Sequence, residues 1–458
     1  MIESLSQITF EKLDESYDLA TSKGYAKPWY SSSLCSHIEN GDERLLNLKF
    51  DNSNEAHDLW NFLLSENERL DKAREDGKII VGAMKDLGTI PVIAYSFPNI
   101  CAFYPDGAWW IPCVMELKEG LLEIADKYGI DESFCPVRAM IGAFDNEEHF
   151  PLPDVLVCSV GATCDDFSSI AQRIEGMGQS VFWWEMLHRR DPMPDEKTVA
   201  LPGGVIAPEV QVEFIKKELL RIIDLFSSLM GEELTDSMLK AGIDKANEIR
   251  TQLNDLRNLT FISEVCPLPA LELLVAEMMA LHYCSDRDEV KNVLNGLLKV
   301  VRERVNRGVG FFGKEAVKIF WVNPVADLRV MNILEECGGR ICGTENLFTH
   351  ALDLIPTDVN PLDALARTAL ADPMACSAND RAKRICRDIK LYNSEAVIIS
   401  RIPGASHCAL EGSIIKDMIS LELNIPVIEI EVSPISDSFH QQIKTRITTL
   451  VETVKGNR

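Results

Sequence analysis

The sequence predicts an α/β protein built from two doubly wound domains, each with a parallel β-sheet. Three observations support this class: short apolar runs alternate with helix-like segments in both halves, one βαβ unit spans 154–185, and a long stretch of helical patterns separates the halves. The expected order is a helical cap at 1–75, a first α/β domain at 76–204, a helical connection at 205–307 and a second α/β domain at 308–458.

The first half contains the clearest strand and helix signals. The N-terminal 75 residues mix apolar and charged positions at helical spacing, which predicts the cap. Two short apolar runs typical of strands follow, KIIVGAM at 78–84 and TIPVIAYS at 89–96. DVLVCSV (154–160) and SVFWWE (180–185) flank a helix that Asp165 or Asp166 would cap, and this βαβ unit predicts parallel strands.

Alternation of strands and helices resumes after the helical connection. The expected strands are AVKIFWVN (316–323), RICGT (340–344), EAVIISR (395–401) and IPVIEIE (425–431). The expected helices lie between them, over ADLRVMNILEEC, 379–392 and EGSIIKDMISLEL, and a final helix places Ile443, Ile447, Leu450, Val451 and Val454 on one face.

Length and charge exclude several classes of protein. At 458 residues the chain can form two or three domains with substantial cores. The net charge of −25 argues against binding to nucleic acid or to anionic membranes. No run of about 18 apolar residues occurs, so no membrane-spanning helix is expected. The acidic N-terminus lacks the regions of a signal peptide, and we expect a cytoplasmic protein.

Cysteines stand where predicted strands end. The chain has 13 cysteines and no sign of a disulfide framework, so most of these thiols are expected to pack in the core. Cys164 follows DVLV, Cys342 lies in RICGT, and Cys408 follows EAVIISR. Ligands of open parallel sheets bind beyond the carboxyl ends of the strands. Cys164 and Cys408 also precede predicted helices, whose N-termini lower a thiol pKa. We therefore expect a ligand held between the two domains.

Other motifs carry weaker signals. No CxxC occurs, which excludes zinc ribbons and ferredoxin-type cysteine runs. GVGFFGKE (308–315) matches GxGxxG, but a helix precedes it and a strand follows it, so a connection is expected and not a phosphate loop. His407, beside Cys408, is a candidate for polarising or protonating a ligand, or else a structural histidine. Trp109, Trp110, Trp321 and 182–185 are expected in the core, with the lining of a pocket as the alternative.

Several segments resemble the 2-hydroxyacyl-CoA dehydratase and benzoyl-CoA reductase subunits, of the 2-hydroxyglutaryl-CoA dehydratase D-component type. They are listed in order: GAMKDLGTIPVIA, ESFCPVRAMIGA with Cys135, TCDD at 163–166, FWVNPVADLRVMNILEECGGRICGTEN, RAKRICRDIKLYNSEAVIISRIPGASHC and LNIPVIEIEVSPISDSFHQQIKTRITTLVETV. The resemblance covers most of the chain and rests on the order of these segments more than on any one motif.

The resemblance implies flavodoxin-like domains and a [4Fe–4S] cluster on three cysteines. Cys164 matches the first ligand and Cys408 the last. For the middle ligand we expect Cys342, with Cys337 and Cys376 as substitutes, although the family position falls near Leu347 and Phe348. His407 would be the catalytic residue beside the cluster.

The implied partners are a second homologous subunit, commonly in a heterodimer, an ATP-hydrolysing iron–sulfur activator, and an acyl-CoA substrate. The activator would deliver a low-potential electron that forms a ketyl radical on the CoA thioester. The implied enzyme is a 2-hydroxyacyl-CoA dehydratase or a benzoyl-CoA reductase. A double-cubane reductase of the same family and a non-catalytic scaffold subunit are the alternatives.

Overall fold

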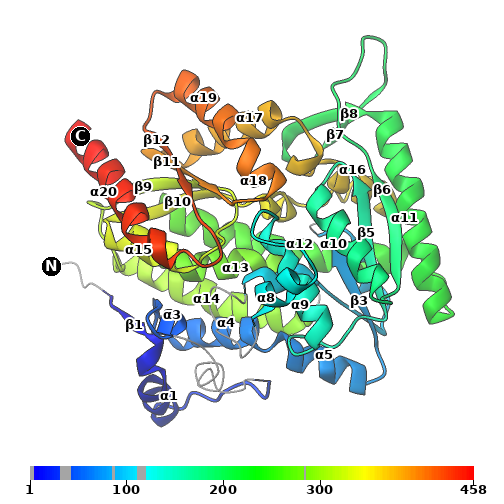
Figure 1. Ribbon diagram of the computed structural model, residues 1–458, viewed down its shortest axis with the longest axis horizontal. Coiled ribbons are helices and arrows are strands. Elements are labelled where there is room, and N and C mark those ends of the chain that lie inside the picture. The colour runs from blue at the N-terminus through cyan, green and yellow to red at the C-terminus, as the bar shows by residue number, and fades with distance from the viewer. Residues whose placement is uncertain (1–4, 31–42, 85–87, 111–119, 283–284) are drawn as a thin grey trace.

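A computed structural model describes residues 5–30, 43–84, 88–110, 120–282 and 285–458, and confirms an α/β fold with parallel sheets (Figure 1). The first sheet has the order β4-β3-β5-β6, and the second has the order β10-β9-β11-β12. All neighbouring strands in both sheets run parallel. The expected division into domains at 75, 204 and 307 stays a prediction.

The strands of the first sheet are β3 (Ile79–Met84), β4 (Ile100–Phe103), β5 (Val155–Gly161) and β6 (Val181–Met186). The helices between them are α6 (Ile90–Ala94), α8 (Leu121–Lys127), α9 (Ala139–Asn146) and α10 (Asp165–Gly176). The prediction of a strand at 89–96 was wrong, because α6 forms there. Pro91 occupies the first turn of α6, where its missing N–H costs nothing, whereas in a central strand it would remove a ladder hydrogen bond.

The second sheet confirms its predicted strands. They are β9 (Val317–Val322), β10 (Gly339–Glu345), β11 (Ala396–Arg401) and β12 (Val427–Glu431). The helices around them are α15 (Arg329–Glu336), α16 (Pro361–Leu370), α17 (Ala378–Tyr392), α18 (Ser406–Leu410), α19 (Gly412–Leu423) and α20 (His440–Asn457).

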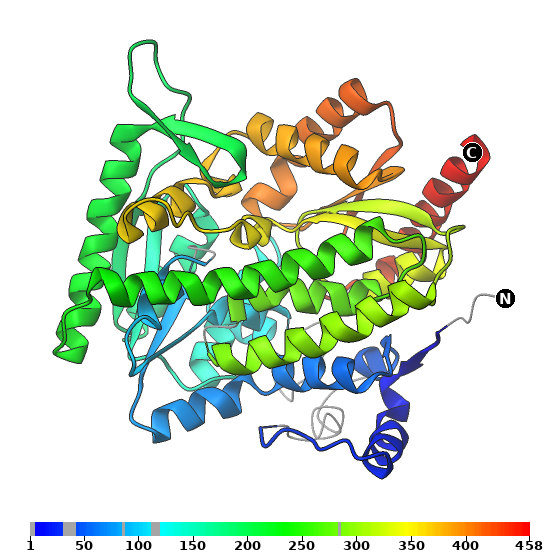
Figure 2. The same cartoon turned by 180° about the vertical axis from the view of Figure 1, so that it is seen from behind.

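The helical connection consists of α11 (Glu209–Met230), α12 (Asp236–Ile262), α13 (Ala270–His282) and α14 (Arg287–Arg307). Seen from behind, α12 runs across the molecule past both sheets, and α14 packs beside it (Figure 2). GVGFFGKE follows α14 and precedes β9, as expected for a connection. Within the described part of the chain, every helix is too short or too polar to cross a lipid bilayer.

The N-terminal segment is mostly helical, as expected, with α1 (Leu13–Ser22), α3 (Glu43–Leu46), α4 (Asn54–Leu64) and α5 (Glu66–Glu75). It also contains two strands, β1 (Gln7–Thr9) and β2 (Lys49–Asp51), which pair antiparallel. A second antiparallel pair, β7 (Thr198–Leu201) and β8 (Val205–Pro208), was not expected from the sequence.

Each sheet packs on both faces. Val155 and Val157 of β5 and Ile319 of β9 belong to one hydrophobic core that includes the central helices α12 and α13. The alternate residues face outward: Cys158 of β5 packs with α9 and α10, and Phe320 of β9 packs with α17 and α19. Because successive side chains of a strand point to opposite faces, a strand buried on both sides is apolar throughout. Cys158 therefore packs, as expected for a strand residue.

Candidate functional site

Cys164 lies at the junction of β5 and α10, the strand–turn–helix arrangement that the sequence predicts. Gly161 makes the turn at a φ of 100°, and a Cβ atom there would come within 2.3 Å of the Met186 carbonyl oxygen. Only glycine fits such a position. Cys164 is the residue immediately before α10, is buried, and has its Sγ 3.7 Å from Oδ2 of Asp166.

Cys408 lies in the corresponding place of the second sheet, after β11 and within α18. The turn between them contains Gly404 at a φ of 76°, and a Cβ atom there would be 2.5 Å from the Phe134 carbonyl carbon. This turn therefore packs directly on the backbone that leads into Cys135. A glycine is what allows the two loops to approach so closely.

Cys135 is the site residue that the sequence reasoning missed. It is the residue before a short 3₁₀ helix (Pro136–Arg138) that leads into α9, and it lines one pocket together with Cys164 and Cys408. Burial raises the pKa of the Cys135 thiol, and the negative charges of Asp166, Cys164 and Cys408 add to this effect. The sequence signal for this position is Pro136, because proline at the first helical position marks the start of a helix. Cys135 therefore stands at a helix start, as Cys164 does.

Cys342 is not brought to Cys164 and Cys408. It is buried within β10 and does not line the pocket. The two substitutes are also elsewhere: Cys337 ends α15 beside Lys444, and the Cys376 thiol donates to the Pro373 carbonyl oxygen at 3.1 Å. The position expected for the middle ligand is taken by Leu347 and Phe348, which do line the pocket. The metal-binding role of each cysteine stays a prediction.

Burial, and not the helix N-terminus, sets the protonation of the Cys408 thiol. Burial raises its pKa far above the ordinary value, although the positive charge of Arg381 opposes this shift. The expected lowering of this pKa is therefore not found. The reason is that removing a thiolate from water costs more free energy than the stabilisation it gains from the few backbone dipoles of a one-turn helix.

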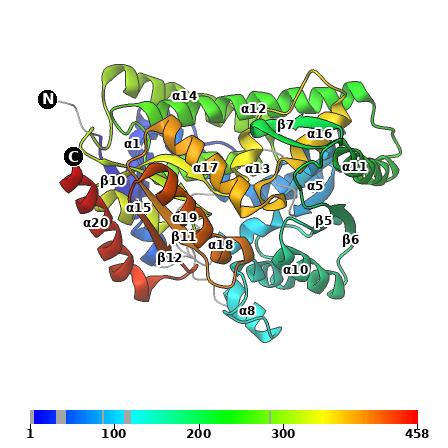
Figure 3. The same ribbon diagram turned by 90° about the horizontal axis from the view of Figure 1, so that it is seen from above.

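Two sets of hydrogen bonds connect the loops that carry the cysteines. Oδ2 of Asp166 accepts from the Ser406 backbone N–H and from its hydroxyl group, both at 3.0 Å. Nε2 of His407 lies 2.7 Å from the Thr163 carbonyl oxygen. Viewed from above, α18 lies beside α10 (Figure 3). The edges of the two sheets are thus joined at the pocket.

His407 lines the pocket, but both of its ring nitrogens are engaged. Nδ1 lies 3.0 Å from Oε1 of Glu411, and Nε2 faces the Thr163 carbonyl oxygen. Both partners are acceptors, so the ring satisfies them only as an imidazolium with two N–H groups. Burial lowers the pKa of His407, yet the hydrogen bond and charge of Glu411 outweigh it and the net shift is upward. Its catalytic role stays a prediction; in this arrangement it joins two loops.

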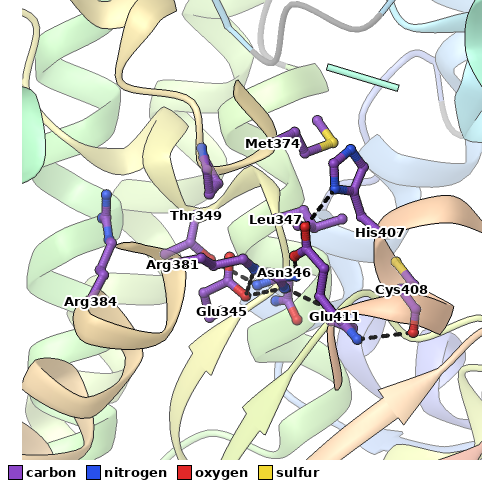
Figure 4. Close-up of polar contacts among 12 residues, drawn as sticks. Glu345, Asn346, Leu347, Thr349, Met374, Arg381, Arg384, His407, Cys408 and Glu411 are labelled. Carbon is purple, nitrogen blue, oxygen red and sulfur yellow. Dashed lines mark hydrogen bonds and ion pairs between the residues drawn. The ribbon is translucent and has the colours of Figure 1, made fainter. Parts of the chain in front are cut away.

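A buried ionic network continues from His407 into the second sheet (Figure 4). Arg381 of α17 donates to Glu411 at 2.8 Å and to Glu345, at the end of β10, at 3.1 Å. Arg381 also donates to Asn323, whose own amide donates to the Cys408 carbonyl oxygen at 3.3 Å. Buried carboxylates require such a partner because their desolvation is costly. The network fixes the carboxyl ends of three strands around Cys408.

The rest of the described pocket lining is mostly apolar, with Asp106 and Asn346 as polar exceptions. Trp109 and Trp110 line it with ring centroids 5.8 Å apart, whereas Trp184 and Trp321 are buried in the core. The lining also includes the following residues: Tyr104, Val137, Phe167, Met278, Leu281, Pro324, Leu347, Phe348, Met374 and Ile402. The walls enclose about 860 Å³ of empty space, part of which is open to solvent.

The three pocket cysteines are candidate ligands for a metal centre. No group of three or more His, Cys, Asp or Glu side chains among the described residues is arranged around one metal ion. An iron–sulfur cluster places each thiolate on a different iron, so its ligands stand further apart than those of a single ion. Three thiols that face one pocket from separate loops are compatible with that donor pattern.

Comparison with known proteins gives one family. The model of the 2-hydroxyglutaryl-CoA dehydratase D-component family matches residues 97–454, which is more than half of the chain. The matched residues include Cys135, Cys164 and Cys408. They also include every strand of the two parallel sheets except β3, which precedes residue 97. A search of curated proteins gives no match.

Proposed function

The chain belongs to the 2-hydroxyglutaryl-CoA dehydratase D-component family, and from this premise we propose that it is the iron–sulfur subunit of an ATP-dependent 2-hydroxyacyl-CoA dehydratase type complex. The observation that carries the proposal is the pocket at the meeting edges of the two sheets, which Cys135, Cys164 and Cys408 line together. The dehydratase class is preferred to a benzoyl-CoA reductase because the matching family is a dehydratase component.

Cys135, Cys164 and Cys408 would hold a [4Fe–4S] cluster in this proposal. When bound, such a cluster supplies one-electron chemistry at low potential and a Lewis-acidic iron. The thiols must lose their protons to act as ligands. Since burial raises the pKa of Cys135 and Cys408, binding of the cluster would release protons from these two sulfurs.

The other residues of the pocket position and shield the reacting groups. Asp166 and His407 keep the two cysteine loops together through their contacts with Ser406 and Thr163. The aromatic and aliphatic walls would limit the access of water, which would protect a reactive intermediate from side reactions. His407 holds its two N–H groups toward Glu411 and Thr163, so it would have to leave one of them before it could donate a proton to a substrate.

The proposed partners follow from the family. A second homologous subunit would complete the enzyme, a separate ATP-hydrolysing iron–sulfur activator would deliver the electron, and an acyl-CoA would be the substrate. GVGFFGKE lacks the strand–loop–helix context of a phosphate loop, which agrees with placing ATP hydrolysis on another protein.

Anaerobic purification followed by iron and sulfide counting tests the proposal. We expect about four irons per chain for the wild type. Cys164→Ser should lose most of the iron, with its far-UV circular dichroism unchanged. The matched control is Cys337→Ser, which alters a half-buried thiol outside the pocket and should keep the iron. A wild type without iron, or a Cys164→Ser variant that keeps it, would overturn the proposal.

A further inference from the structure

The loop after β10 forces a leucine into an unfavourable backbone conformation at the pocket wall. The Phe348 backbone N–H donates to the Asn346 carbonyl oxygen at 2.7 Å, which closes a three-residue γ-turn centred on Leu347. Leu347 has a φ of 62° and a ψ of −45°. Turns of this hand are rare, and a side chain in them is strained. Strain of this kind persists only where the surrounding structure imposes it.

Buried contacts impose the turn. The Asn346 backbone N–H donates to the Thr349 hydroxyl group at 3.0 Å, and its side-chain amide donates to Oε2 of Glu277 at 2.9 Å. Glu277 is itself buried and accepts from Thr344 at 2.6 Å and from Arg257. The result is that Leu347 is only 7 % exposed and lines the pocket together with Phe348. The apolar wall is thus built at a cost in backbone strain.

The charged groups of the pocket would not receive a carboxylate. Among the described lining residues there is no Lys or Arg, and the two carboxylates are Asp106 and Asp166. The imidazolium of His407 is already paired with Glu411 and Thr163. Asn346 also lines the pocket, and its buried Oδ1 has no hydrogen-bond partner among the described residues; as an acceptor, this oxygen offers no proton to a carboxylate. A carboxylate on the acyl group would lose its hydration here without gaining a cationic side chain from the described lining residues.

We propose that this pocket takes the acyl group of an uncharged, apolar thioester and rejects a dicarboxylic one. The inference rests on the proposed function for the thioester itself and goes beyond it in the class of acyl group. A glutaryl group carries a second carboxylate, so this preference would exclude the dicarboxylic acyl group after which the family is named. Trp109, Phe167 and Phe348 supply the surfaces on which an apolar chain or an aromatic ring would pack.

Isothermal titration of the full chain, purified anaerobically, tests the proposal with two thioesters of similar length. Hexanoyl-CoA has an uncharged acyl group, glutaryl-CoA has a terminal carboxylate, and CoA alone is the blank. We expect hexanoyl-CoA to bind at least about tenfold more tightly than glutaryl-CoA, since the carboxylate would be buried without a partner. Equal or tighter binding of glutaryl-CoA would overturn the proposal, and so would equal binding of hexanoyl-CoA and CoA.

A matched pair of variants locates the preference. Leu347→Asn places a polar side chain in the turn and suits a positive φ better than leucine does, so the preference should shrink. Leu354→Asn alters a half-exposed leucine of the same connecting segment outside the pocket and should keep it. An unchanged preference in Leu347→Asn would contradict the assignment of this wall. The iron count is independent of these titrations: iron without a thioester preference refutes only this inference, and a preference without iron refutes only the cluster.

Discussion

The two sheets share one strand order but contribute different chemistry to the pocket. Numbered within each sheet, both read 2-1-3-4, because β4-β3-β5-β6 and β10-β9-β11-β12 follow the same pattern. In both, the third strand leads to a cysteine, Cys164 in the first and Cys408 in the second. Equivalent loops of parallel sheets reach equivalent edges. A repeated topology is thus enough to bring two thiols from distant parts of the chain to one place.

The connection before the third strand is where the sheets differ. In the first it contains Cys135, just ahead of α9, and this thiol lines the pocket. In the second it contains Cys376, just ahead of α17, and this thiol donates to the Pro373 carbonyl oxygen while Met374 lines the pocket. Among the described residues, the first sheet therefore supplies two thiols to the pocket and the second supplies one, together with the strained Leu347 wall. The two sheets thus share a topology but contribute different side chains to the pocket.

The largest effect should come from removing the ionic network of the second sheet. Arg381→Met would leave the buried Glu345 and the partly buried Glu411 without their cation, and we expect the free energy of unfolding to fall by about 3–5 kcal/mol. Urea unfolding measures it. Lys383→Met, on the same helix but exposed, should change the free energy by less than about 1 kcal/mol. Similar losses in the two variants would show that the network does not stabilise this edge.

A glycine substitution tests the contact between the two edges. Gly404→Ala would place a Cβ atom against the Phe134 backbone at a positive φ, and we expect a loss of about 2–4 kcal/mol in the free energy of unfolding. Gly231 also has a positive φ, but a Cβ atom there would have no neighbouring atom within 4 Å. Gly231→Ala should therefore lose only about 1 kcal/mol in the free energy of unfolding. Thermal or urea unfolding compares them. Equal losses would mean that the close packing beside Cys135 is not required.

The helical layer shared by both sheets should make stability depend on pH. Burial raises the pKa of Glu272 in α13 to about 8, with a further rise from Asp51. A raised carboxyl pKa means that the folded chain binds more protons, so stability is full below the unfolded pKa and falls as the pH rises toward 8. From pH 6 to pH 8 the loss should be on the order of 2 kcal/mol.

Glu272→Gln provides the comparison for this pH effect. In the wild type, Oε1 of Glu272 accepts from the Asp51 backbone N–H at 3.0 Å and from the Trp60 indole N–H at 3.1 Å. A glutamine oxygen at this position can still accept both hydrogen bonds. The variant should therefore lose less stability than the wild type between pH 6 and pH 8, and the remaining loss should come from Glu335, whose pKa burial raises to about 7. If it loses as much stability as the wild type between pH 6 and pH 8, another group is responsible.

Local patterns predict most of the fold and part of the site. The run DVLVCSV and the cap at Asp165 specify β5 and α10, so the position of Cys164 could be read directly from the sequence. Cys408 follows from the same reasoning. Cys342 was grouped with the strand-end cysteines although it lies in the middle of the predicted strand RICGT, and β10 keeps it inside the sheet. Parallel pairing with β9 brackets this position, since Ile341 pairs with Ile319 and Thr344 with Trp321, and the sequence alone does not reveal that pairing.

Cys135 depends on a contact that spans more than 250 residues of the chain. Its place at the pocket follows from the packing of Gly404 on the Phe134 backbone, and no local pattern encodes such a pairing. Helix α6 (Ile90–Ala94), where a strand was expected at 89–96, was missed for a related reason. A five-residue apolar run has no clear period, and the helix start at Pro91 had to be recognised instead. Contacts between distant segments and the secondary structure of short apolar runs are therefore not encoded in local sequence patterns.

The iron content of two serine variants tests the central claim most directly, since Cys135 and Cys376 hold matching positions in the two sheets. Cys135→Ser and Cys376→Ser would be purified anaerobically, and iron per chain would be measured beside the wild type. The account predicts that Cys135→Ser loses most of its iron and that Cys376→Ser keeps the wild-type content. Retention of iron by Cys135→Ser, with its loss from Cys376→Ser, would contradict the assignment of the three pocket thiols.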